Sequence, residues 1–234
     1  MDWSKPSKEH YKYIRELKKL HTDANLDYYI MQVNDVLYIA FAESEDKEDW
    51  ASNLNFYPEQ YDPYVKVKAH RGLAAQYMSV RQVILDYLYG REIKEVYVAG
   101  FSLGGAITTL AVEDIGYHID RDNLNVKVLG ISYDGPRVFS PNKIVKKAVK
   151  GRLITVKTHN DPVIHVPWKI MPTFFYFRWG PFKFAFDWKA FLRGRLTFWK
   201  DYGKIVWIGH LFRFLPLQHF PDQIEKALEE KYGH

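Results

Sequence analysis

The chain has 234 residues, of which 47% are hydrophobic and 26% are charged; this fits one folded domain, residues 1–234, and excludes an intrinsically disordered chain. It contains no cysteine, which excludes a disulfide framework and a thiolate metal site. The net charge of +5 comes without any RNP-like, helix-turn-helix or zinc-finger pattern, so we expect no nucleic-acid partner.

The first part of the chain predicts a helix and then a hairpin. Residues 8–20 carry hydrophobic side chains at helical spacing. Residues 27–33 and 35–41 have the character of strands, and Asn34-Asp35 between them favours a tight turn. A further short strand is expected at residues 64–69.

Helix-like and strand-like segments alternate through the rest of the chain. The expected helices are residues 71–89 (ended by Gly90), about 102–114, 142–150 and 221–232. The expected strands are residues 95–100, 126–134, 152–160 and 204–208. This alternation predicts an α/β fold with a mostly parallel central sheet flanked by helices and with the early hairpin at its edge.

One strand-to-helix corner carries the sequence Gly100-Phe101-Ser102-Leu103-Gly104, which matches the pattern G-x-S-x-G. A strand that reverses sharply into a helix strains the serine backbone, and the glycines leave room for neighbouring chains. The helix N-terminus then directs amides toward a developing oxyanion, with the Leu103 N–H as one donor. These features predict that Ser102 is a nucleophile.

A serine needs a base and an acid, which follow in the order acid and then histidine in α/β-hydrolases. Asp161 lies where the strand 152–160 ends and is the candidate acid. Three downstream histidines remain open as the base: His165, His210 and His219.

An aromatic segment, about residues 170–200, separates the candidate acid from the last two histidines. Twelve of the 29 residues 172–200 are Phe, Tyr or Trp, and Phe175, Phe177 and Trp179 precede a Gly-Pro turn signal. We interpret the segment as a substrate cap or a lipid-surface contact near the acyl pocket. A hairpin with one aromatic face and a bent segment packed into the core are both compatible with its pattern.

The location of the protein is predicted from what the sequence lacks. The N-terminal residues contain no apolar signal region, and no stretch reaches the roughly 18 uncharged apolar residues of a membrane span. We therefore expect a cytoplasmic protein. The excess of Lys and Arg in residues 141–200 favours contact with a membrane surface.

Six motifs in order resemble those of the class 3 lipase family of α/β-hydrolases, over residues from about Asp35 to Leu228. NDVLYIAFAESEDKEDWASNL resembles the family's FRGT/S…DW…NL segment, KAHRGLAAQYMSV its VHxGF helix start, and AGFSLGGA its GHSLGGA turn. DGPRVFSP resembles GxPRVGN, NDPVIHVP resembles NxxDxVPxLP, and QHFPDQIEKAL resembles the histidine segment before the last helix.

The resemblance implies a role for each matching residue. Ser102 is the nucleophile, Asp161 orients and stabilises the imidazolium, and His219 is the base, ahead of His210. The oxyanion hole is then formed by the N–H groups of Leu103 and Ser44.

Three positions depart from the family's motifs. Ala42-Glu43 replaces Arg-Gly beside the expected oxyanion hole, which adds an acid and removes a glycine. Phe101 replaces the histidine before the nucleophile and joins Phe175, Phe177 and Trp179 as a candidate for the substrate pocket. Phe139-Ser140 replaces Gly-Asn, whereas His70 matches a family histidine that we interpret as structural.

The sequence therefore predicts a serine carboxylic-ester hydrolase that acts on acylglycerols or other lipid esters and needs no metal or cofactor. Two alternatives stay open. One is a phospholipase or acyltransferase with the same triad, which the basic aromatic segment favours. The other is a non-catalytic lipid-binding homologue, which Ala42-Glu43 keeps in view.

Overall fold

The computed structural model describes most of the chain. The described residues are 2–16, 21–23, 26–42, 58–61, 66–159, 161, 163–165, 167, 169–172, 175–178, 183–186, 196–209 and 221–233.

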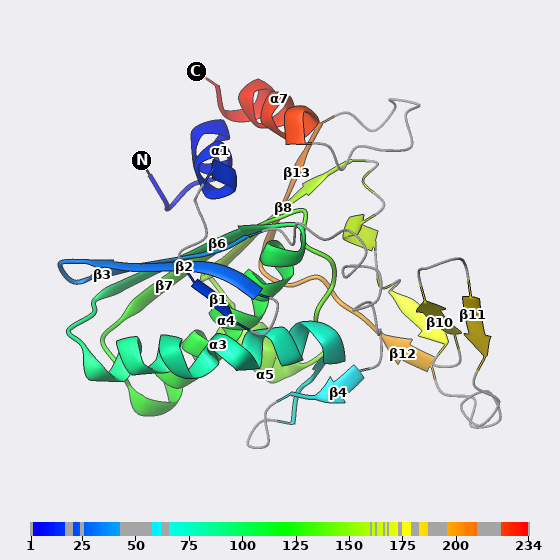
Figure 1. The fold of residues 1–234 in the computed structure, drawn as a ribbon, viewed down its shortest axis with the longest axis horizontal. Coiled ribbons are helices and arrows are strands. Elements are labelled where there is room, and N and C mark those ends of the chain that lie inside the picture. The colour runs from blue at the N-terminus through cyan, green and yellow to red at the C-terminus, as the bar shows by residue number, and fades with distance from the viewer. Residues whose placement is uncertain are drawn as a thin grey trace.

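A seven-stranded sheet forms the centre of the fold (Figure 1), in the order β1-β2-β3-β6-β7-β8-β13. Its strands are β1 (His21–Asp23), β2 (Leu26–Val33), β3 (Val36–Phe41), β6 (Glu95–Phe101), β7 (Lys127–Tyr133), β8 (Leu153–Thr158) and β13 (Lys204–Ile208). Neighbours are parallel from β3 to β13, while β1, β2 and β3 pair antiparallel. Both the parallel sheet and the hairpin at Asn34-Asp35 are thus confirmed.

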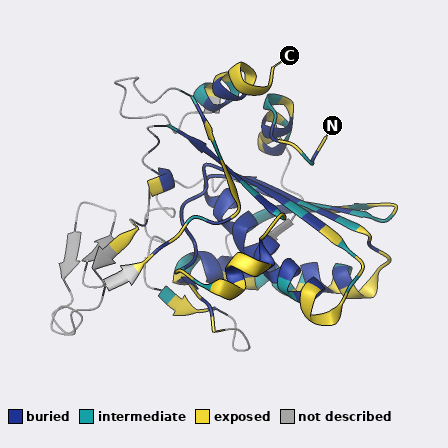
Figure 2. Cartoon of the chain, turned by 180° about the vertical axis from the view of Figure 1, so that it is seen from behind, coloured by how far each residue is buried: buried dark blue, intermediate teal, exposed yellow. Residues whose placement is uncertain are grey.

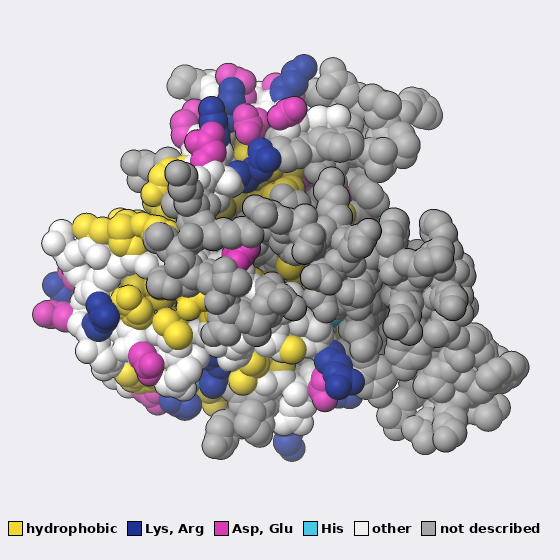
Figure 3. Space-filling view, in the orientation of Figure 1, with side chains coloured by type: hydrophobic (Ala, Val, Ile, Leu, Met, Phe, Trp, Pro, Cys, Tyr) yellow, Lys and Arg dark blue, Asp and Glu magenta, His cyan; other side chains and the backbone are white. Residues whose placement is uncertain are grey.

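Helices cover both faces of the sheet. On one face lie α1 (Lys8–Glu16) and α7 (Pro221–Tyr232), which pack against each other, as Figure 1 shows at the top of the view. On the other face lie α3 (Arg71–Gly90), α4 (Leu103–Asp122) and α5 (Lys143–Ala148). Figure 3 shows acidic and basic side chains interspersed over α1 and α7, where Lys8 pairs with Glu229.

The period-two alternation of β6 divides its side chains between hydrophobic clusters on the two faces of the sheet. Val96 and Val98 lie in the large core under α3 and α4. Phe101 faces the opposite side and packs with Tyr11 of α1 and Leu228 of α7 in a second core. Figure 2 shows buried residues on both sides of the sheet, so the strand that ends at Ser102 is fixed from both faces.

Helix α4 is longer than the sequence predicted, since it runs to Asp122 and not to 114. It ends where Asn123 adopts a left-handed conformation, with φ of 54°, and donates its N–H to Ile119. The polar residues Glu113 and Asp114, at the end of the expected helix, are both buried. They lie in a polar network inside the fold and do not mark a solvent-exposed terminus.

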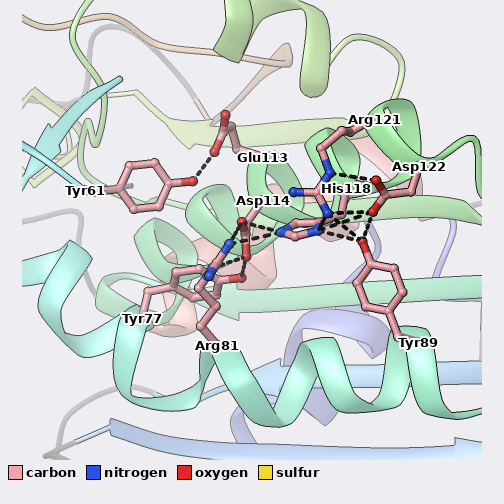
Figure 4. Close-up of polar contacts among 9 residues, drawn as sticks. All are labelled: Tyr61, Tyr77, Arg81, Tyr89, Glu113, Asp114, His118, Arg121 and Asp122. Carbon is pink, nitrogen blue, oxygen red and sulfur yellow. Dashed lines mark hydrogen bonds and ion pairs between the residues drawn. The ribbon is translucent and has the colours of Figure 1, made fainter. Parts of the chain in front are cut away.

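This network joins α3 to α4 (Figure 4). Arg81 donates to both oxygens of Asp114 at 2.8 and 2.9 Å, and the Tyr77 hydroxyl donates to Asp114 at 2.7 Å. Arg81 also contacts His118 at 3.0 Å, and the Tyr89 hydroxyl contacts the other ring nitrogen of His118 at 2.7 Å. Buried, charge-assisted bonds of this kind hold two helices in one register.

The remaining short strands lie outside the main sheet. They are β4 (Pro58–Gln60) with β5 (Lys68–His70), β9 (Ile170–Pro172) with β12 (Leu196–Phe198), and β10 (Phe175–Arg178) with β11 (Lys183–Phe186). The last pair confirms a hairpin in the aromatic segment, with Phe175 opposite Phe186 and Phe177 opposite Phe184. Strand β5 overlaps the strand expected at 64–69, of which residues 64–65 lie outside the described ranges.

Candidate active site

Ser102 is the single residue between the end of β6 and the start of α4. Its φ of 53° and ψ of −118° are rare for a residue with a side chain and cost on the order of 1–3 kcal/mol. Serine is a favoured N-cap, yet the Ser102 side chain makes no capping hydrogen bond to α4. Helix capping therefore does not explain the strain, whereas a nucleophile elbow does.

The two glycines of the motif are required by backbone contacts. A Cβ atom on Gly100 would lie 2.3 Å from the carbonyl oxygen of Gly104, and one on Gly104 would lie 2.2 Å from that of Phe41. A backbone atom cannot rotate away as a side chain can. The expected reason for glycine two residues before and after the serine is thus confirmed by the geometry.

The start of α4 supplies unpaired amides at the elbow. The first N–H groups of a helix have no acceptor within the helix, and Leu103 is the first residue of α4. The Ser102 N–H is already bound to the carbonyl of Tyr133 at 2.9 Å, so it is not the donor. The Leu103 N–H, at the positive end of a twenty-residue helix, fits the predicted oxyanion donor.

The end of β3 reaches the same corner. Its last residue, Phe41, and the following Ala42 present their carbonyl groups to Gly104. The Ala42 N–H donates to Asp27 at 2.9 Å. The chain thus leaves β3 beside the elbow, while Glu43 and Ser44 lie outside the described residues and Ser44 stays a predicted donor.

Asp161 is fully buried just beyond the end of β8, in the same sheet as β6. Its N–H donates to the carbonyl of Thr158 at 3.3 Å, and its carboxylate accepts the N–H of Val163 at 2.8 Å. The turn η1 (Val163–His165) follows directly. Because β6, β7 and β8 are consecutive parallel strands, Ser102 and Asp161 follow carboxyl ends at one edge of the sheet, where α/β folds place functional groups.

A second buried carboxylate, Asp134, was not predicted as part of the site. It follows β7 with a φ of 46° and accepts both the N–H and the hydroxyl of Thr158, at 2.6 and 2.7 Å. Its only sequence signal is an Asp-Gly pair after a strand, which usually marks an exposed turn. Asp134 ties the strand beside the nucleophile to the strand that carries the candidate acid.

Of the three candidate bases, His165 lies within the residues that the structure describes. His165 lies in the turn after Asp161, is exposed, and gives its carbonyl to Arg137 at 2.7 Å. Partial burial and then the nearby Arg137 lower the pKa of its ring. His210 and His219 lie outside the described residues. His219 precedes Pro221, the first residue of α7, by two positions, and its role as the base stays a prediction.

Other histidines have structural surroundings. His70 is the N-cap of α3, where its Nδ1 accepts the Leu73 N–H at 3.4 Å, and burial lowers its pKa to about 4. His10 bonds to the Tyr133 hydroxyl at 2.9 Å, and burial lowers its pKa to about 4 as well. Neutral buried imidazoles of this kind agree with the structural interpretation of His70 and indicate the same role for His10.

Of the pocket candidates, Phe101 has a described side chain. It is 2% exposed, and its ring meets Tyr11 edge-on at 5.4 Å between centroids. These are the contacts of a core residue, so we assign Phe101 to the packing of the elbow and not to an open pocket wall. Phe175 and Phe177 lie on strand β10, Trp179 lies outside the described residues, and their contact with substrate stays a prediction.

Within the described ranges, none of the helices has the length and apolar character that crossing a membrane requires. In the same part of the chain, no three His, Asp or Glu side chains converge as metal ligands would.

A mostly parallel sheet with a strained serine between strand and helix defines an α/β-hydrolase fold. The family model of Lipase (class 3) matches residues 38–171, and the chain belongs to this family. The resemblance to the class 3 lipase family is thereby confirmed, while the last of the six motifs, QHFPDQIEKAL, lies beyond the matched residues and stays a prediction.

Comparison with known proteins gives the same relatives in sequence and in structure. The chain is 28% identical to a lipase of Rhizomucor miehei over 138 residues. This aligned region covers 56% of this chain and 37% of that protein. The structure of Rhizomucor miehei lipase in its propeptide complex superposes with a TM-score of 0.56 at 22% identity, over 82% of this chain and 56% of that one. Lipase II from Rhizopus niveus superposes with a TM-score of 0.50 at 25% identity, over 64% of this chain and 59% of that one. The chain thus spans less than two thirds of these relatives.

Proposed function

We propose that this protein is a serine carboxylic-ester hydrolase that acts on acylglycerols or other lipid esters. The observation that carries the proposal is the strained, uncapped Ser102 at the buried N-terminus of α4. Membership of the class 3 lipase family and similarity to the Rhizomucor miehei lipase support the lipid substrate.

The proposed reaction uses side chains and water alone. Ser102 Oγ attacks the ester carbonyl carbon while His219 accepts the hydroxyl proton. The oxyanion that forms is stabilised by the N–H groups of Leu103 and Ser44. His219 then protonates the leaving alcohol, and a water molecule, deprotonated by the same histidine, hydrolyses the acyl-enzyme. Asp161 orients the ring of His219 and stabilises its charged form.

The first test is hydrolysis of p-nitrophenyl esters from acetyl to palmitoyl, with labelling by a fluorophosphonate. We expect Ser102→Ala to abolish both, whereas Ser79→Ala should leave both unchanged, because the Ser79 hydroxyl donates to the Gln76 carbonyl within α3. Retained turnover in Ser102→Ala would disprove the assignment. The chain-length optimum distinguishes an esterase from a lipase.

A second pair of variants identifies the base. Turnover should be lost in His219→Ala and kept in His210→Ala, and the reverse result would exchange their roles. A preference for anionic phospholipid vesicles over neutral esters would favour the phospholipase or acyltransferase alternative. Vesicle binding without any fluorophosphonate labelling would favour a non-catalytic homologue.

A further inference from the structure

Two buried cations bind the backbone of the turn after the candidate acid. Lys157 Nζ donates to the carbonyl of Ile164 at 3.2 Å. Arg137 Nη1 donates to the carbonyls of His165 at 2.7 Å and Pro167 at 3.1 Å. The Lys157 and Arg137 side chains are 2% and 5% exposed, so water competes little for these bonds. One short stretch of backbone is thus held at three carbonyls.

A single carboxylate joins these cations. Asp201 Oδ2 accepts from Arg137 Nε at 3.0 Å, and Asp201 Oδ1 accepts from Lys157 Nζ. The backbone beside Asp201 is itself fixed, because the Lys200 N–H donates to the carbonyl of Phe139 at 3.0 Å. Asp201 therefore connects three parts of the chain. Arg137 follows β7, Lys157 belongs to β8, and Asp201 itself precedes β13.

The charged groups around this junction shift one another's pKa values. Burial lowers the pKa of Lys157, while the adjacent Asp201 opposes that shift. Asp134, which follows the end of β7, favours the charged form of the same lysine, and burial, Arg137 and Lys157 lower the pKa of the His165 ring. Without the charge of Asp201, the two buried cations would lose the carboxylate that both of them bind.

We propose that Asp201 is a positioning residue for Asp161. By holding Lys157 and Arg137 on the carbonyls of the turn, it fixes the backbone that follows Asp161 and so the orientation of the Asp161 carboxylate toward the base. This inference rests on the proposed function, in which Asp161 stabilises the charged form of His219.

The test compares Asp201→Asn with wild-type enzyme in p-nitrophenyl ester hydrolysis across pH. We expect kcat to fall by about 10- to 100-fold with little change in KM, because a displaced acid affects the chemical step. The acid limb of the kcat/KM profile should move down by about one pH unit, since a base without its carboxylate partner is charged less easily. A merely structural role would lower stability and leave this limb in place.

Two further variants make the comparison specific. Asp120→Asn removes the carboxylate of another partly buried ion pair, with Arg152 at 2.7 Å, and should leave kcat and the pH profile unchanged. Lys157→Met combined with Asp201→Asn removes one charge of each sign and should return the acid limb toward its wild-type position. This double variant also provides an independent result if Asp201→Asn alone does not fold.

Amide hydrogen exchange tests the same idea without turnover. The Val163 N–H, which is bonded to Asp161, should exchange about tenfold faster or more in Asp201→Asn but not in Asp120→Asn. Wild-type kcat, pH profile and Val163 protection in Asp201→Asn would overturn the inference. Absence of Ser102-dependent hydrolysis in wild-type protein would instead disprove the proposed function, and the exchange result would still decide whether Asp201 fixes the turn.

Discussion

Replacement of Gly104 by alanine should disturb the elbow, because the new Cβ atom would clash with the backbone at the end of β3. The new Cβ would lie 2.2 Å from the Phe41 carbonyl oxygen, so that α4 and the end of β3 must separate by about 1.2 Å to reach an ordinary 3.4 Å contact. Overpacking of this kind costs about 1–3 kcal/mol. For a domain of this size the melting temperature should fall by about 2–12 °C. Since the Leu103 amide and the Ala42 segment move apart, kcat should fall by about 10- to 100-fold.

Gly90→Ala is the matched control for this prediction. Gly90 ends α3, and a Cβ built there meets nothing within 4 Å. This substitution should leave turnover unchanged and alter stability by no more than about 1 kcal/mol, in the stabilising direction. Thermal unfolding followed by circular dichroism, with ester hydrolysis on the same samples, measures both effects. Equal melting temperatures and equal turnover for the two variants would refute the reasoning from the Gly104 contact.

Two predictions concern polar groups away from the elbow. Tyr77→Phe removes a donor from the buried Asp114 and should lower the free energy of unfolding by about 1–3 kcal/mol in urea titrations, whereas Tyr87→Phe should change it by less than about 0.5 kcal/mol. His10 has a folded-state pKa of about 4 and an ordinary value of 6.5, so the unfolded chain takes up its proton first as the pH falls. This residue should therefore contribute about 2–3 kcal/mol to the stability lost between pH 7 and 4.5, and a His10→Asn variant with the full wild-type loss would contradict that assignment.

The elbow could be predicted from sequence because its determinants are local. A valine-rich strand, a glycine two residues before the serine and another two residues after it all lie within one short segment. Steric exclusion at a strand-to-helix corner depends on that segment and on the backbone that any neighbouring strand presents. The structure adds which backbone that is, namely the carbonyl of Phe41 at the end of β3.

The length of α4 could not be predicted in the same way. Glu113, Asp114 and His118 have the appearance of a polar helix end when the sequence is taken alone. Asp114 is paired with Arg81 and Tyr77, which approach from α3 and lie more than thirty positions earlier in the chain, and Glu113 is paired with Tyr61. Residues that pair only after two helices have packed leave no periodic signal in either one.

The surroundings of the candidate acid show the same limit. The sequence predicts Asp134 only as the last residue of the strand expected at 126–134, and its acceptor role depends on Thr158 in the next strand. Asp201 lies 44 positions from Lys157 and 64 from Arg137, so that no local pattern connects them. Sequence motifs identify residues that the chemistry needs, but the groups that hold those residues in place are chosen by topology.

Topology also connects the N-terminal helix to the proposed base. Helix α7 begins two residues after His219, and α1 holds it through the ion pairs Lys8–Glu229 and Arg15–Glu225 and through the buried ring of Tyr11. The same Tyr11 ring meets Phe101, the residue before the nucleophile. One helix at the start of the chain thus contacts both the strand that carries Ser102 and the helix that follows His219. The strand before Ser102 and the helix after His219, far apart in sequence, therefore share contacts with α1 on the face of the sheet opposite α4.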